Sequence, residues 1–344
     1  NNRQKAEVSV LKKEKDTDRV LEGAVFALSA KEDITNKDGD VVLEAGTVIE
    51  EKATGEDGKL TFEADLPIGF SYVVKETSPA PGFATTDEVQ EFTFTAESSD
   101  KTTVSYEFIF EDEPTVFEFT KTSLTDGKEV EGAELTVTDE NGEVVDEWVS
   151  GKEPHIIKEL VVGQTYTMTE VLPAPGYVTA ESIQFTVEDT AEVQKIEMKD
   201  DVTKVEISKT DIAGKELPGA KLTILDENGE VVESWTSTEE PHYIEMLPIG
   251  KYTLHEESAP EGYLIAEDVA FEVKDTGEIQ KVVMKDEAEP EETPETPETP
   301  ATTVDAPKTG DHTPIVALMI SCGLGLAGIV AAATWMKMRK KKQD

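Results

Sequence analysis

Three sets of ionisable residues interrupt runs of alternating apolar residues, and each set holds one lysine, one glutamate and one aspartate. Residues two apart in a β-strand lie on the same face, so a lysine that follows two alternate apolar residues faces the core with them. Lys12, for example, follows Val8 and Val10. The sequence therefore predicts three buried triads. They are Lys12, Glu76 and Asp112, then Lys121, Glu170 and Asp200, and finally Lys209, Glu256 and Asp286.

A buried triad of this composition can form an amide bond. Because an isolated ion is costly in an apolar interior, burial favours a neutral amine and a neutral carboxyl group. The lysine is then a nucleophile that attacks the aspartate, and a protonated glutamate can transfer the proton as water leaves. The simpler alternatives are a buried salt bridge, or lysines that extend toward solvent at strand ends.

The triads lie in three copies of one repeat. Residues 204–235 resemble residues 116–148, and a longer first copy begins at residues 8–28. Since an internal repeat marks a repeated structural unit, we expect three domains, at 1–114, 115–202 and 203–288.

Within each repeat, short runs rich in Val, Ile, Thr, Phe and Tyr are separated by Gly, Pro and Asn-Gly. This pattern is typical of antiparallel strands in a β-sandwich, so we expect an all-β protein of three tandem Ig-like sandwiches. The Asn-Gly pairs at 141–142 and 228–229 indicate hairpin turns. The acidic residues around them lack the full ligand spacing of a calcium loop, so neither a metal nor a cofactor is predicted.

Several segments resemble the SpaA-like domains, also called CnaB or prealbumin-like domains, of Gram-positive pilins and adhesins. They include YVVKETSPAPGF at 72–83, YTMTEVLPAPGY at 166–177 and YTLHEESAPEGY at 252–263. The resemblance covers about residues 6 to 288. It implies prealbumin-like sandwiches in which a lysine of the first strand bonds to an Asn or Asp of the last strand, with a glutamate as catalyst.

Residue by residue, the resemblance implies the nucleophiles Lys12, Lys121 and Lys209, the catalytic acids Glu76, Glu170 and Glu256, and the acceptors Asp112, Asp200 and Asp286. An aspartate acceptor fits the loss of water rather than ammonia. Lys13 and Lys15 compete with Lys12 for the first role. Lys12 is preferred because it precedes Gly23 by the same 11 residues that separate Lys121 from Gly132.

The C-terminal region indicates a membrane segment and a cell-wall signal. Residues 313–336 are uncharged and long enough to span a bilayer as a helix, and the basic residues of 337–344 are expected to stay in the cytoplasm. The preceding segment Ala306-Pro307-Lys308-Thr309-Gly310 resembles the LPXTG sorting signal, with alanine in place of the usual leucine. The resemblance implies that a sortase cleaves after Thr309 and joins it to peptidoglycan, following transient membrane insertion. A Pro/Gly loop before an ordinary membrane helix is the alternative.

Composition limits the remaining possibilities. Residues 289–305 are rich in Pro, Glu and Thr and are expected to form an extended spacer. The net charge of -42 repels phosphate, so no nucleic acid is expected as a partner. The one cysteine, Cys322, lies in the apolar C-terminal segment, so the predicted domains contain no disulfide. Because the chain starts at Asn1 without methionine, an export signal is expected upstream.

These features favour the stalk of an adhesin-type surface protein, located in the cell wall and facing a host or matrix ligand. An enzyme is not predicted, because His155 and His242 recur after Glu-Pro as structural residues would, and the sequence has neither a phosphate loop nor a nucleophile elbow. Two alternatives remain open. One is a subunit or basal anchor of a sortase-assembled pilus, and the other is the wall anchor of a surface enzyme whose catalytic head precedes Asn1.

Overall fold

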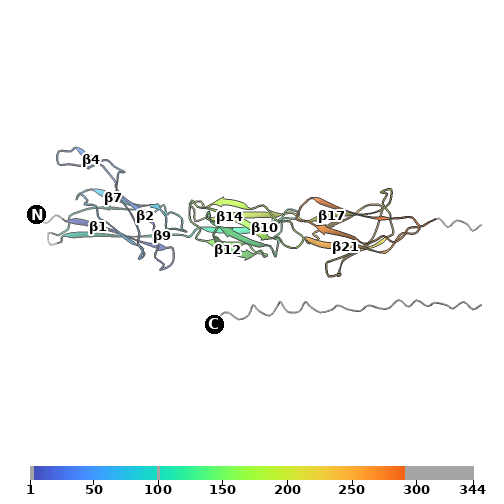
Figure 1. Ribbon diagram of the computed structural model, residues 1–344. Helices are drawn as coiled ribbons and strands as arrows, with labels where there is room; N and C mark the ends of the chain where they lie inside the picture. The colour runs from blue at the N-terminus through green and yellow to red at the C-terminus, as the bar shows by residue number, and fades with distance from the viewer. Residues whose placement is uncertain (1–3, 99–100, 291–344) are drawn as a thin grey trace, which may run out of the picture. The chain divides into compact units, whose positions relative to one another are not determined.

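The structure is a computed structural model that describes residues 4–98 and 101–290 (Figure 1). Residues Asn1–Pro290 form one compact unit. The described ranges contain strands, turns and loops, which confirms the all-β prediction. They contain no helix long and apolar enough to cross a membrane. The predicted sorting motif, membrane helix and basic tail lie outside the described residues, as does the spacer beyond Pro290.

The first module packs a three-stranded sheet, in the order β6-β1-β9, against a four-stranded sheet, in the order β5-β2-β7-β8. A short hairpin of β3 and β4 is added to it (Figure 1). Its strands are β1 (Lys5–Glu14), β2 (Val25–Ala30), β3 (Ile34–Thr35), β4 (Val41–Leu43), β5 (Val48–Ala53), β6 (Lys59–Phe62), β7 (Ser71–Ser78), β8 (Val89–Thr93) and β9 (Thr103–Asp112).

The second module repeats the arrangement without the added hairpin, with sheets in the orders β13-β10-β16 and β12-β11-β14-β15. Its strands are β10 (Val116–Ser123), β11 (Glu134–Thr138), β12 (Val144–Val149), β13 (His155–Lys158), β14 (Thr165–Leu172), β15 (Ile183–Thr186) and β16 (Val193–Asp200).

The third module has the same two sheets, in the orders β20-β17-β23 and β19-β18-β21-β22. Its strands are β17 (Lys204–Asp211), β18 (Lys221–Leu225), β19 (Val231–Thr236), β20 (His242–Glu245), β21 (Gly250–Ser258), β22 (Val269–Val273) and β23 (Ile279–Asp286).

Each module has its own apolar core between its two sheets. In the first module, Val8 and Val10 of β1 belong to the same buried cluster as Phe26 of β2, whose ring lies 4.8 Å from that of Phe110 on β9. Separate clusters fill the second and third modules. The apolar residues come from alternate positions of each strand, which is the pattern that led to the prediction of a sandwich.

The direction of one strand pair differs from the prediction. Most neighbouring strands are antiparallel, but the first and last strands of each module run parallel, as β1 and β9, β10 and β16, and β17 and β23. Alternation specifies which side chains face the core and says nothing about the direction of the neighbouring strand. The expectation of antiparallel strands was therefore wrong for this one pair in each module.

The two Asn-Gly pairs lie in hairpin turns, as predicted. Asp139 accepts the backbone N–H groups of Asn141 and Glu143 between β11 and β12, at 2.9 and 2.8 Å. Gly142 has φ +81°, a conformation that favours glycine. Asp226 repeats these contacts between β18 and β19.

Candidate functional site

The residues of each predicted triad meet in the core of their module. In the first module, Lys12 of β1 contacts Oδ1 of Asp112 on β9 through its Nζ atom. The same Nζ lies 2.9 Å from Oε1 of Glu76, which comes from β7 in the opposite sheet. All three side chains are fully buried.

The other two modules repeat this geometry. Lys121 contacts Oδ1 of Asp200 and lies 2.9 Å from Oε1 of Glu170. Lys209 contacts Oδ1 of Asp286 and lies 2.8 Å from Oε1 of Glu256. In each module, the structure thus brings together the three residues of the predicted triad.

The parallel strand pair sets the distance between lysine and aspartate. Lys12 lies opposite Phe110 in the register of β1 and β9, and Asp112 is two residues further along the same face. Lys121 lies opposite Met198, and Lys209 lies opposite Met284, with the same offset to the aspartate. A lysine side chain is long enough to bridge this offset, so its Nζ reaches the carboxyl group within the core.

A backbone amide holds the other oxygen of each glutamate. The N–H of Thr86, ten residues after Glu76, donates to Glu76 Oε2 at 2.9 Å. The equivalent bonds run from Ala180 to Glu170 at 2.6 Å and from Ala266 to Glu256 at 2.7 Å. Because Oε2 is held in this way, Oε1 is left to face the lysine. The sequence analysis missed these amides, since no side chain marks them.

Burial also changes the protonation of the aspartates. It raises the pKa of Asp112 to about 7 and that of Asp200 to about 6, although the adjacent lysine acts in the opposite direction by favouring the carboxylate. Burial raises the pKa of Asp286 as well. Burial therefore shifts each aspartate toward the neutral acid, which is the electrophilic form of a carboxyl group.

The second oxygen of each aspartate lacks a donor when both carboxyl groups of the triad are ionised. Among the residues that the structure describes, none donates a hydrogen bond to Oδ2 of Asp112, Asp200 or Asp286, and each of these atoms is buried. A buried polar atom without a partner costs about 1 to 3 kcal/mol. Each triad therefore combines a close lysine–aspartate contact with a buried aspartate oxygen that has no donor.

The three lysines that compete in the first module have different surroundings. Lys13 lies 3.5 Å from Asp18 with a quarter of its side chain exposed, and Lys15 contacts Glu113 with half of its side chain exposed. Lys12 is fully buried, and its Nζ lies 5.4 Å from the centre of the Phe26 ring. Lys12 is thus the lysine inside the core.

The two recurring histidines make structural contacts. The ring of His155 stacks on Trp148 with centroids 4.3 Å apart, and its Nε2 lies 2.9 Å from Oδ2 of Asp146. His242 repeats the stack on Trp235 at 4.3 Å. Since β12 and β13 belong to different sheets, the first stack joins the two sheets of its module along one edge.

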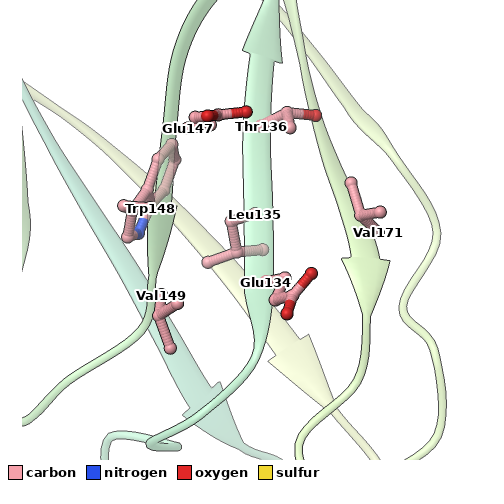
Figure 2. A pocket seen from close by; sticks show the side chains of 7 residues that line it. All are labelled: Glu134, Leu135, Thr136, Glu147, Trp148, Val149 and Val171. Carbon is pink, nitrogen blue, oxygen red and sulfur yellow. The ribbon is translucent and has the colours of Figure 1, made fainter. Parts of the chain in front are cut away.

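A shallow hollow on the second module extends across β12, β11 and β14 (Figure 2). The side chains of Glu134 and Glu147 are its titratable groups, and Trp148, Val149 and Val171 supply apolar surface. These groups do not combine a nucleophile with a base.

The repeat is also found by comparison with known domains. The sequence matches the SpaA prealbumin-like fold domain three times, over residues 6–107, 115–202 and 203–288. The chain belongs to the SpaA family of prealbumin-like domains. No curated protein matches it.

Similar solved structures include three proteins that each match more than four fifths of this chain. The Bacillus anthracis TIE protein is 27% identical, with a TM-score of 0.42, and the match covers 83% of this chain and 51% of that one. This SpaA-type chain thus spans about half the length of the TIE protein. BcpA, the major pilin subunit of Bacillus cereus, is 16% identical, with a TM-score of 0.35 and coverage of 83% and 100%. A streptococcal ancillary pilin is 15% identical, with a TM-score of 0.32 and coverage of 82% and 99%.

Proposed function

We propose that this chain is the structural stalk of a cell-surface protein of the adhesin type, and that each module closes a Lys–Asp isopeptide bond within itself. The observation that carries the proposal is the contact of a buried lysine Nζ with a buried aspartate Oδ1 in all three modules. A buried ion pair is a weak source of stability, because apolar residues of similar volume serve as well. Its threefold repetition therefore favours a chemical role.

The proposed step is a condensation. The neutral Nζ attacks Cγ of the protonated aspartate, so a C–N bond forms and the C–OH bond breaks. The hydroxyl group leaves as water after it takes one hydrogen from the nitrogen. The glutamate lies within 2.9 Å of Nζ, so it can relay this proton to the leaving oxygen.

The product removes one cost of the unlinked core. One carboxyl oxygen departs as water, and a neutral amide replaces two ionisable groups. The three groups come from one chain and are already in contact, so the proposed reaction needs no added enzyme.

Mass spectrometry tests this proposal. The full chain should have an intact mass that is lower than the calculated mass by one water per bond, three waters in all. Protease digestion should release branched peptides that join Lys12 to Asp112, Lys121 to Asp200 and Lys209 to Asp286. A well-folded protein with the unreduced mass would contradict the proposal and leave three buried ion clusters.

The sorting motif at 306–310 supplies the proposed anchor. A sortase would cleave between Thr309 and Gly310, and the threonine carbonyl would pass to an amine of peptidoglycan. The support is the order of the motif, the apolar segment at 313–336 and the basic tail. Cell-wall digests of a Gram-positive host should contain a peptide that ends in Thr309 linked to a peptidoglycan amine. Retention of the uncleaved chain in the membrane fraction, with active sortase present, would contradict this assignment.

A subunit or basal anchor of a pilus is the second candidate, because a polymerised subunit would use the same modules and the same sorting motif. Gel electrophoresis of wall extracts separates the two. A pilus subunit gives a ladder of covalent multimers, whereas a stalk gives the single anchored species.

A further inference from the structure

The segment that holds each glutamate also contacts the following module. The N–H of Thr86 donates to Glu76, and the residue before it, Thr85, contacts Asp189 of the second module. The backbone N–H of Thr85 donates to Asp189 Oδ1 at 2.7 Å, and its hydroxyl group donates to Oδ2, also at 2.7 Å. Two adjacent residues thus join the triad of one module to a carboxylate of the next.

The junction between the second and third modules repeats the arrangement. Ala180 donates its N–H to Glu170, and the N–H of the preceding Thr179 donates to Oδ1 of Asp275 at 2.9 Å. Asp189 follows β15 and Asp275 follows β22, so both belong to the loop before the last strand of their module.

The third module lacks this contact in the part of the chain that the structure describes. Ala266 still donates to Glu256, but the preceding residue is Ile265, with 61% of its surface exposed. No described aspartate accepts the Ile265 amide. The third triad is therefore an internal reference, because it has no such contact among the described residues.

Further contacts join neighbouring modules at the same two junctions. Glu159 lies against Gly82 across the first junction, where a Cβ on the glycine would come within 2.8 Å of the Glu159 carbonyl oxygen. Thr115, between the two modules, donates its hydroxyl to the carbonyl of Leu160 at 2.7 Å. Arg19 of the first module also pairs with Glu159, at 2.5 and 2.9 Å. The second junction repeats the close approach at Gly176 and Met246.

We infer that Asp189 and Asp275 are positioning residues for isopeptide formation in the module that precedes their own. By holding the backbone at Thr85, Asp189 fixes the adjacent Thr86 amide, and this amide turns Oε1 of Glu76 toward Lys12. Asp275 does the same for Glu170 through Thr179. This inference rests on the proposed function, since it concerns the rate of the same reaction.

The consequence is an order of maturation. The first bond closes quickly only after the second module has folded and docked, and the second bond depends on the third module in the same way. The third bond closes without a contact of this kind.

The test follows bond formation in the full chain after a short pulse of expression, with samples quenched over time and the three branched peptides quantified by mass spectrometry. Asp189→Ala should slow the Lys12–Asp112 bond about tenfold, as expected for the loss of two hydrogen bonds. The bonds in the second and third modules should keep their rates. Asp189→Asn, which still offers an acceptor to the Thr85 amide, should restore most of the rate. Asp275→Ala should instead slow formation of the Lys121–Asp200 bond.

Each other outcome overturns the inference in a recognisable way. An unchanged rate for the first bond in Asp189→Ala would show that docking does not position Glu76, while the bonds themselves still form. An equal delay of the second bond would show that Asp189 acts by stabilising its own module. If the unaltered chain forms no bonds, the proposed function fails and the inference fails with it.

Discussion

Oδ2 of each triad aspartate is buried without a hydrogen-bond donor, while the adjacent Oδ1 contacts the lysine. Burial shifts these groups toward the neutral acid, and in the proposed reaction the neutral acid is the form that loses water. One physical cause, removal from solvent, therefore shifts the aspartate toward its electrophilic form and leaves Oδ2 without a donor.

The rate of bond formation should depend on pH differently in the first two modules. Since the pKa of Asp112 is raised to about 7 and that of Asp200 to about 6, each aspartate is protonated below its value and loses the proton as the pH rises through it. Formation of the first bond should thus decline at a higher pH than formation of the second. Initial rates measured by peptide mass spectrometry between pH 5 and pH 8 check this, and superimposable profiles would contradict it.

Replacing the glutamate should leave its module unlinked. Glu170→Ala and Glu256→Ala should each restore the mass of one water, because the proton relay to the leaving oxygen is lost. Each variant should also lower the free energy of unfolding of its module by about 4 to 5 kcal/mol, since a cross-link over 79 or 77 residues restricts the unfolded chain. Glu261→Ala, an exposed change in the third module, is the matched control for mass and for urea unfolding. If the mass of Glu170→Ala were still three waters below its calculated mass, the proton relay would be ruled out.

At the scale of elements, the turn that follows the strand of the triad glutamate has different surroundings in different modules. Gly82, Gly176 and Gly262 occupy equivalent turns with φ between +85° and +88°. A Cβ at Gly176 would lie 2.5 Å from the carbonyl oxygen of Met246, whereas nothing lies within 4 Å of one at Gly262. The same turn is a junction surface in one module and an open loop in another.

This difference allows a matched pair of substitutions. Gly176→Ala and Gly262→Ala both place alanine at a positive φ, which costs about 1 kcal/mol. Gly176→Ala must also displace the Met246 backbone, at a further cost of about 1 to 3 kcal/mol. Urea unfolding should therefore show a larger loss for Gly176→Ala, with new protease cleavage near residues 202–204. Equal losses in the two variants would mean that the junction does not restrict this turn.

Much of this arrangement could be predicted from the sequence. Alternation along single strands was sufficient to place Lys12, Glu76 and Asp112 in one core, because the side-chain period of a strand is fixed. The parallel direction of β1 and β9 could not be predicted, since it depends on how the chain crosses between sheets. The contact of Thr85 with Asp189 was also missed. Both residues are ordinary loop residues, and only tertiary structure brings them together.

At the scale of the whole molecule, the proposed bonds determine which residues carry tension. Lys12 lies near the end of β1, and Asp112 ends the parallel strand β9. A pull on the chain enters along β1, crosses the amide and leaves after Asp112. The residues between them are bypassed, and the same holds between Lys121 and Asp200.

Single-molecule pulling should show this directly. The linked chain should extend without the unfolding of any described module. Glu170→Ala should add one unfolding event that releases roughly 270 Å, since the 79 residues from Lys121 to Asp200 span about 3.4 Å each when extended. Events of that length in the fully linked chain would contradict the proposed path of tension.

The β3–β4 hairpin is an insertion of the first module, and it lies between Lys12 and Asp112 in the sequence. Once the bond has formed, this hairpin belongs to a closed loop of chain that carries no tension. Sequence added within such a closed loop changes neither the length of the tether nor its tensile strength. The modules can therefore gain loops, and with them new binding surfaces, while the mechanical design stays the same.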